Sequence, residues 1–113
     1  MMDFDIKQNI IYEDQNLLII NKPRGLLLQQ DSNDSRASLD KIASEYLKAT
    51  AMPVHRLDKD TSGLCVFAKN EKAAKEMGLI FNDHSQIRKR YITLVNGVIE
   101  EDGEVDAPLR KSF

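Results

Sequence analysis

The segment from His55 to Gly63, with the sequence HRLDKDTSG, is the part of the chain best equipped for chemistry. It places carboxylates at Asp58 and Asp60 directly before an apolar run, residues 63–68, that predicts a buried strand. Polar loops positioned by a rigid sheet commonly hold binding and catalytic groups. A simpler interpretation is a solvated turn, in which the charges pair locally and Gly63 relaxes the backbone.

Two other kinds of site fail on spacing. Asp58, Asp60 and Ser62 match the alternating oxygen ligands of a calcium loop, but the twelfth position, which should be Glu, is Lys69. A serine hydrolase elbow needs glycine two places before its serine, and Asp60 stands there instead. Neither a calcium site nor a hydrolase site is therefore expected in this loop.

The remaining composition argues against metal, membrane and secreted proteins. The two histidines, His55 and His84, are distant in sequence, and the one cysteine, Cys65, lies in an apolar run, so neither a metal site nor a disulfide is expected. No glycine-rich phosphate loop is present, and we expect no cofactor. No apolar run approaches the ~20 residues of a membrane span, and the N-terminus lacks a signal region. These features predict a soluble protein of a reducing, cytoplasmic compartment.

Charge is distributed unevenly along the chain. The net formal charge is −2, which argues against a protein that coats nucleic acid over a broad surface. Residues 55–97 nevertheless carry eight basic and five acidic groups, whereas residues 98–113 carry two basic and five acidic groups. A positive middle between acidic flanks favours a local basic cleft.

Periodicity and turn signals predict an α+β fold with a mixed, largely antiparallel sheet and two helices. Ser38 and Asn70 are expected to cap the helices. The inward positions are expected at Leu39, Ile42, Ala43, Tyr46 and Leu47 in the first helix, and at Ala73, Ala74, Met77, Ile80 and Phe81 in the second. A polar loop is expected at 29–36, and strands are expected at 9–13, 17–21, 63–68, 91–95, 98–99 and 103–107, with a hairpin turn at Asn96-Gly97.

Three motifs in order resemble the RluA-type RNA pseudouridine synthases, which isomerise uridine in ribosomal or transfer RNA. The first is Asn21-Lys22-Pro23 with Gly25, after two short strands. The second is the HRLD segment followed by Asp60-Thr61-Ser62-Gly63, and the third is Lys89-Arg90-Tyr91 with Val95 and Gly97. The resemblance runs from about Ile10 to Leu109 and implies part of the pseudouridine synthase catalytic fold.

The resemblance also implies roles for individual residues. Asp58 would be the catalytic carboxylate; whether it attacks the sugar, adds to the base or removes a ribose proton stays open. Because a stacked uridine must be extruded from RNA, Arg56 would fill the vacated space or hold a phosphate. Tyr91 would stack on uracil and handle the proton at C5, and Lys89 would support Tyr91 or a phosphate. Residues that support the loop would be His55, Thr61 and Gly63.

The match runs out near the end of the sequence. Members of the family continue with further strands, a His-Gln-Ile/Leu-Arg motif and a later arginine that completes the pocket, and these have no counterpart here. We therefore expect residues 1–113 to be the N-terminal portion of a catalytic domain, with its C-terminal part absent and little activity alone. The alternatives are a non-catalytic RNA-binding remnant and a plain interaction domain; the RNA target, ribosomal or transfer, and the oligomeric state stay open.

Overall fold

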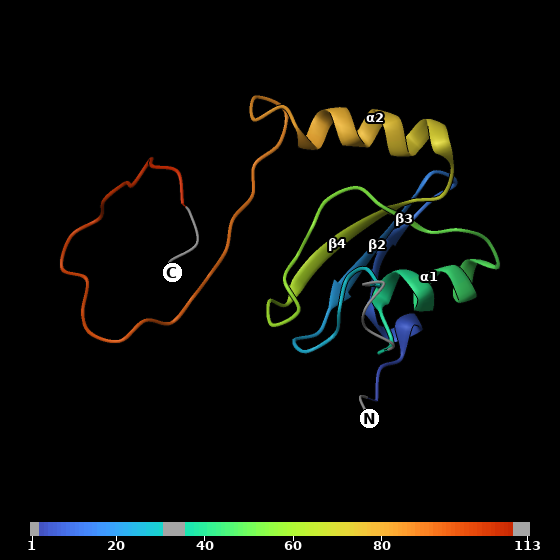
Figure 1. The fold of residues 1–113 in the computed structure, drawn as a ribbon, viewed down its shortest axis with the longest axis horizontal. Coiled ribbons are helices and arrows are strands. Elements are labelled where there is room, and N and C mark those ends of the chain that lie inside the picture. Colours follow the sequence, from blue (N-terminus) through green and yellow to red (C-terminus); the bar gives the residue numbers. More distant parts are fainter. Residues whose placement is uncertain (1–2, 31–35, 110–113) are drawn as a thin grey trace.

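The computed structural model describes residues 3–30 and 36–109. Four strands, two α-helices and one short 3-10 helix form the regular part of these residues (Figure 1). In chain order they are η1 (Ile6–Asn9), β1 (Ile10–Glu13), β2 (Leu17–Lys22), α1 (Leu39–Leu47), β3 (Met52–Pro53), β4 (Gly63–Ala68) and α2 (Glu71–Phe81). The polar loop predicted at 29–36 falls mostly on residues 31–35, which lie outside the described residues.

The strands form one antiparallel sheet in the order β1-β2-β4-β3. Strands β2 and β4 pair along their whole length, from Leu17 opposite Ala68 to Lys22 opposite Gly63. Their buried side chains alternate along β2, as expected for a sheet with one face on a core. The predicted first hairpin, the buried strand at 63–68 and the α+β class are confirmed, and all strand pairs in the described residues are antiparallel.

The core lies between the sheet and α1. Leu18 and Ile20 of β2 stand opposite Phe67 and Cys65 of β4, and all four side chains are fully buried. Leu39 and Ala43 of α1 join the same cluster. Each inward position predicted for α1 and α2 is buried or half-buried, so the helical periodicity is confirmed.

The two helix caps differ from each other. Asn70 accepts a hydrogen bond from the Ala73 N–H at 2.8 Å, which confirms its predicted role. Ser38 occupies the N-cap position of α1, but its side chain makes no bond to the helix backbone. Its buried hydroxyl donates to the Asp40 carboxylate instead. The prediction that Ser38 caps α1 is therefore correct for its position and wrong for its hydrogen bond.

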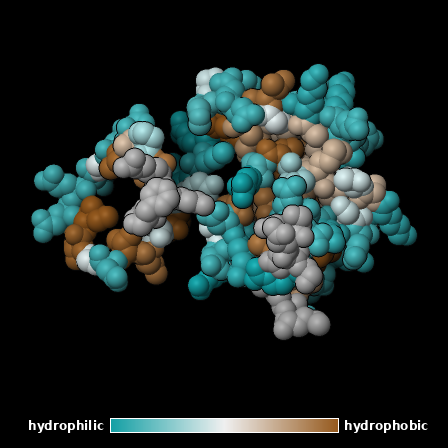
Figure 2. Space-filling view, viewed as in Figure 1, coloured by the Kyte–Doolittle hydropathy of each residue, from teal (hydrophilic) through white to brown (hydrophobic). Residues whose placement is uncertain are grey.

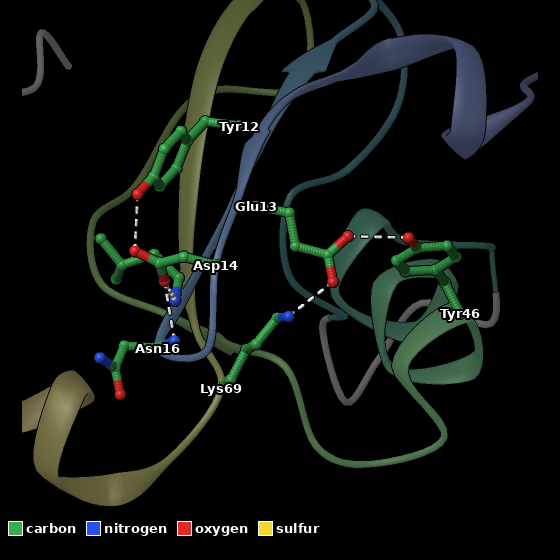
Figure 3. A network of polar contacts seen from close by, with 7 residues as sticks. Tyr12, Glu13, Asp14, Asn16, Tyr46 and Lys69 are labelled. Carbon is green, nitrogen blue, oxygen red and sulfur yellow. Dashed lines mark hydrogen bonds and ion pairs between the residues drawn. The ribbon is translucent and has the colours of Figure 1, made fainter.

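A polar network fastens the β1–β2 hairpin to its neighbours (Figure 3). Glu13 accepts a hydrogen bond from the Tyr46 hydroxyl of α1 at 2.7 Å and pairs with the Lys69 ammonium after β4. Asp14 accepts from the backbone N–H groups of Asn16 and Leu17, which closes the turn between the two strands. The network joins α1 and the β4–α2 junction to the same hairpin.

The strands predicted at 91–95, 98–99 and 103–107 are wrong in the described structure. Residues 87–109, here called the extended segment, contain no strand and run away from the sheet (Figure 1). Gly97 has φ of +92°, as a tight turn would require, but no ladder forms on either side. Figure 2 shows apolar residues exposed on this part of the molecule, and Ile92 and Leu94 are 96% and 98% exposed. A lone two-stranded hairpin is marginally stable, so local sequence alone does not order it.

Candidate active site

The loop that carries Asp58 connects β3 to β4 and is held through its backbone. The Thr61 N–H donates to the Asp58 carbonyl at 3.0 Å, which forms a turn. The Lys59 carbonyl accepts from the Gly25 N–H at 2.8 Å, which ties the loop to the turn after β2. The Asp58 side chain itself is exposed. The structure therefore fixes the backbone at Asp58 and Lys59 and leaves the Asp58 carboxylate accessible.

Lys22 is the residue that connects the loop to the core, and sequence reasoning gave it no role. Its side chain is fully buried, and its Nζ donates to the carbonyls of Pro23 at 2.9 Å, Leu26 at 2.7 Å and Lys59 at 2.9 Å. All three ammonium protons are thus used. Burial lowers the pKa of Lys22 from its ordinary value. A lysine at the end of an apolar strand, directly before a Pro-x-Gly turn, was the available sequence signal.

Nearby carboxylates oppose the effect of burial on the pKa of Lys22. Desolvation is the largest effect on the pKa of Lys22, and the carboxylates of Asp60 and Asp58 oppose it by favouring the charged ammonium. The ammonium therefore lies within electrostatic reach of both loop carboxylates.

His55 fixes the start of the loop against β4 and α2. Its Nε2 accepts a hydrogen bond from the Val66 N–H at 3.0 Å, which places the ring proton on Nδ1. The ring stacks on Phe81 of α2, with centroids 4.7 Å apart and planes 6° from parallel. Burial lowers the pKa of His55; a hydrogen bond to the Arg56 carbonyl opposes this, and the charge of Lys89 reinforces it. The neutral ring is therefore the form that fits this position.

Asp58 and Arg56 line one cleft of about 340 Å³. Its other wall is formed by residues 27–30, which follow the turn after β2. Two of the predicted site residues, the carboxylate and its neighbouring arginine, thus share a concave surface. Leu57 lines this cleft as well.

Five other predicted site residues line a second, wider cleft of about 750 Å³ between the loop and the start of the extended segment. They are His55, Thr61, Gly63, Lys89 and Tyr91. Neither Asp58 nor Arg56 lines it, and Leu57 is the residue common to both clefts. The structure therefore does not bring Tyr91 into the cleft of Asp58. Tyr91 is 61% exposed because the segment that carries it pairs with no described strand.

Metal and thiol chemistry find no support in the described residues. No group of three or more His, Cys, Asp or Glu side chains gathers there as metal ligands. Cys65 is buried in the core, and burial raises its pKa to about 11, so its thiol is held in the unreactive form. No helix within residues 3–30 and 36–109 is long and apolar enough to cross a membrane.

Comparison with known proteins decides the family. The sequence profile of RNA pseudouridylate synthases matches residues 16–112, which include both clefts and the three sequence motifs. The chain belongs to this family. The predicted resemblance to the RluA-type synthases is thereby confirmed.

Curated relatives and solved structures agree with the family. A tRNA pseudouridine synthase C from Haemophilus ducreyi is 36% identical over 104 residues, which cover 90% of this chain and 42% of that protein. A ribosomal large subunit pseudouridine synthase D from Zymomonas mobilis is 40% identical over 117 residues, covering 96% and 37%. The structure of human RNA pseudouridylate synthase domain containing 4 is 30% identical with a TM-score of 0.52, covering 68% of this chain and 30% of that one.

The structure of human RNA pseudouridylate synthase domain containing 1 shares the fold at 23% identity, with a TM-score of 0.57. The match covers 73% of this chain and 31% of that chain. This chain therefore spans between 37% and 42% of the length of the two curated synthases compared above.

Proposed function

We propose that this chain supplies the aspartate-bearing portion of an enzyme that isomerises uridine to pseudouridine in RNA. Asp58 is the catalytic carboxylate. The observation that supports this proposal is that the Asp58 side chain is exposed while the backbone of its loop is held at the Lys59 carbonyl. A catalytic group must be held in place by its support while remaining open to substrate, and Asp58 meets both conditions.

The reaction moves one bond and one proton. The bond from ribose C1′ to uracil N1 breaks, and a bond from C1′ to C5 forms after the base turns. The proton that C5 loses is balanced by the one that N1 gains, so the isomerisation consumes no cofactor. Arg56 lies on the cleft of Asp58, where it holds a phosphate or fills the space that the extruded uridine leaves.

Tyr91 takes part only after the extended segment closes on the loop. Its ring then stacks on uracil and its phenol handles the C5 proton, with Lys89 beside it. Because Tyr91 lines a different cleft from Asp58, residues 1–113 act as the N-terminal portion of a catalytic domain that is completed by further chain. The RNA target is ribosomal or transfer RNA, and the working compartment is the cytoplasm.

The assay measures conversion of uridine in an RNA transcript, or an adduct with a 5-fluorouridine RNA stem-loop, with the chain present in excess. Asp58→Asn is expected to abolish the signal, by roughly 10³-fold or more if turnover is measurable. Asp60→Asn is the matched control, because Asp60 is an exposed carboxylate of the same loop. A wild-type signal that persists equally in both variants would rule out Asp58 as the catalytic group.

A second candidate is a non-catalytic RNA-binding chain. The separation of Tyr91 from the cleft of Asp58 favours it. It predicts RNA binding that survives Asp58→Ala and no isomerisation or adduct in any RNA tested. The fluorouridine adduct therefore separates the two candidates.

A further inference from the structure

A run of three cations, Arg88-Lys89-Arg90, lies on the wall of the wider cleft. All three side chains are exposed, and the sequence contains no Asp or Glu from His84 to Ile99. Within the described residues, no carboxylate forms an ion pair with Arg88 or Arg90. The run thus presents positive charge that the described structure does not neutralise, in a chain whose net charge is −2.

The run is held beside the aspartate loop, although the rest of the extended segment is not. The Lys89 Nζ lies 5.6 Å from the centre of the Phe81 ring, within cation–π range. The ring of His55 stacks on the same Phe81 ring. A chain of contacts therefore links the run to the first residue of the HRLD segment.

The chemistry of the cleft fits an anionic strand. Among the residues that line it, the three cations outnumber the single carboxylate, Asp60, and the hydroxyls of Thr61 and Ser62 add neutral donors. The guanidinium group of an arginine can donate two parallel hydrogen bonds to two oxygens of one phosphate. Cations next to an exposed aromatic ring, here Tyr91, are typical of sites that follow a single nucleic acid strand. An acidic peptide would supply negative charge for the three cations but no nucleobase to stack on the Tyr91 ring.

We propose that Arg88, Lys89 and Arg90 bind the phosphates on either side of the target uridine in an unpaired stretch of RNA. The inference rests on the proposed function for the identity of the RNA, and it names a phosphate-binding role for Arg88 and Arg90 alongside Lys89. The wider cleft is then the path of the strand, and the narrower cleft receives the extruded nucleotide.

The test is the salt dependence of binding to a short, uridine-containing single-stranded RNA, measured by fluorescence anisotropy. The variant is Arg88→Gln/Lys89→Gln/Arg90→Gln. Its matched control is Lys41→Gln/Lys72→Gln/Lys75→Gln, which removes the same charge from exposed lysines on α1 and α2 that do not line either cleft. Each phosphate contact contributes about 0.7 to the slope of log K against log salt for a single strand.

The run variant is expected to bind at least about tenfold more weakly at low salt, with a slope flatter by about 2, while the control keeps the wild-type slope. Equal losses in both variants, no loss in either, or no RNA binding by the wild type would each overturn the inference. Thermal unfolding should be alike in all three proteins because every changed side chain is exposed.

The inference and the proposed function fail in different ways. RNA binding that depends on the run but yields no Asp58-dependent adduct would support the phosphate site and sink the catalytic role. An Asp58-dependent adduct that the run variant forms equally well, with unchanged RNA affinity, would support the catalytic role and overturn the phosphate site.

Discussion

The sheet with its two helices and the extended segment are built from equally apolar residues but differ in what covers them. In the sheet, Ile20 and Phe67 are fully buried by cross-strand neighbours and α1. In the extended segment, Leu94 and Val98 are 98% and 88% exposed. Alternation of apolar residues therefore makes a strand only where a partner edge and a covering layer exist. The family's second and third motifs fall on opposite sides of this division.

The largest effect should come from the core. Phe67→Ala is expected to lower the free energy of unfolding by about 3–5 kcal/mol, because it removes a fully buried ring between the sheet and α1. Leu94→Ala, on the extended segment, should change it by less than about 0.5 kcal/mol. Urea denaturation followed by circular dichroism measures both. A large loss for Leu94→Ala would mean that the segment packs in solution.

A smaller effect is expected at the link between core and loop. Lys22→Met keeps most of the side-chain volume but removes the ammonium donor from the carbonyls of Leu26 and Lys59, of which Lys59 keeps the Gly25 N–H. The expected loss of stability is about 1–3 kcal/mol. Amide hydrogen exchange should also speed up in residues 56–62 more than in β1. Lys72→Met, at an exposed position on α2, is the control; exchange that rises equally in both strand and loop would point to general destabilisation instead.

The smallest effect concerns pH. The folded state lowers the pKa of His55, so between that value and the ordinary value near 6.5 the unfolded chain binds more protons. The stabilisation is therefore complete above about pH 6.5 and is lost as pH falls through the folded value, with a slope of at most about 1.4 kcal/mol per pH unit. Protonation also puts a second donor opposite the Val66 N–H.

Unfolding measured from pH 7.5 to 5 checks this. His55→Gln should flatten the pH dependence below pH 6.5, whereas His84→Gln, at an exposed histidine, should leave it unchanged. A pH dependence that survives His55→Gln would assign the proton uptake to another group.

Much of the fold could be predicted from local sequence. The first hairpin follows from two aliphatic runs around Asp14-Gln15-Asn16, and α2 follows from Asn70 and its periodic apolar face. These elements depend on contacts between near neighbours and on one-sided burial. The strands predicted after Tyr91 had equally good patterns and are wrong here, because a strand needs partners that periodicity cannot supply.

The candidate site divides in the same way. The HRLD and Lys-Arg-Tyr motifs identified the family and the residues to consider, but not their grouping into two clefts that meet at Leu57. Spacing placed Ser38 at the start of its helix, but it did not reveal that the Ser38 hydroxyl would bond Asp40 instead of the helix backbone. Such outcomes depend on which neighbour the fold places within reach.

By itself the sequence determined which chemistry-bearing residues this chain carries, Asp58 above all, and the local elements that flank them. Only the tertiary structure decided how that aspartate is supported. Lys22 reaches the Lys59 carbonyl across 37 residues of sequence because the pairing of β2 with β4 brings the ends of both strands together. A buried ammonium needs acceptors, and this fold supplies one of them from the loop that carries Asp58.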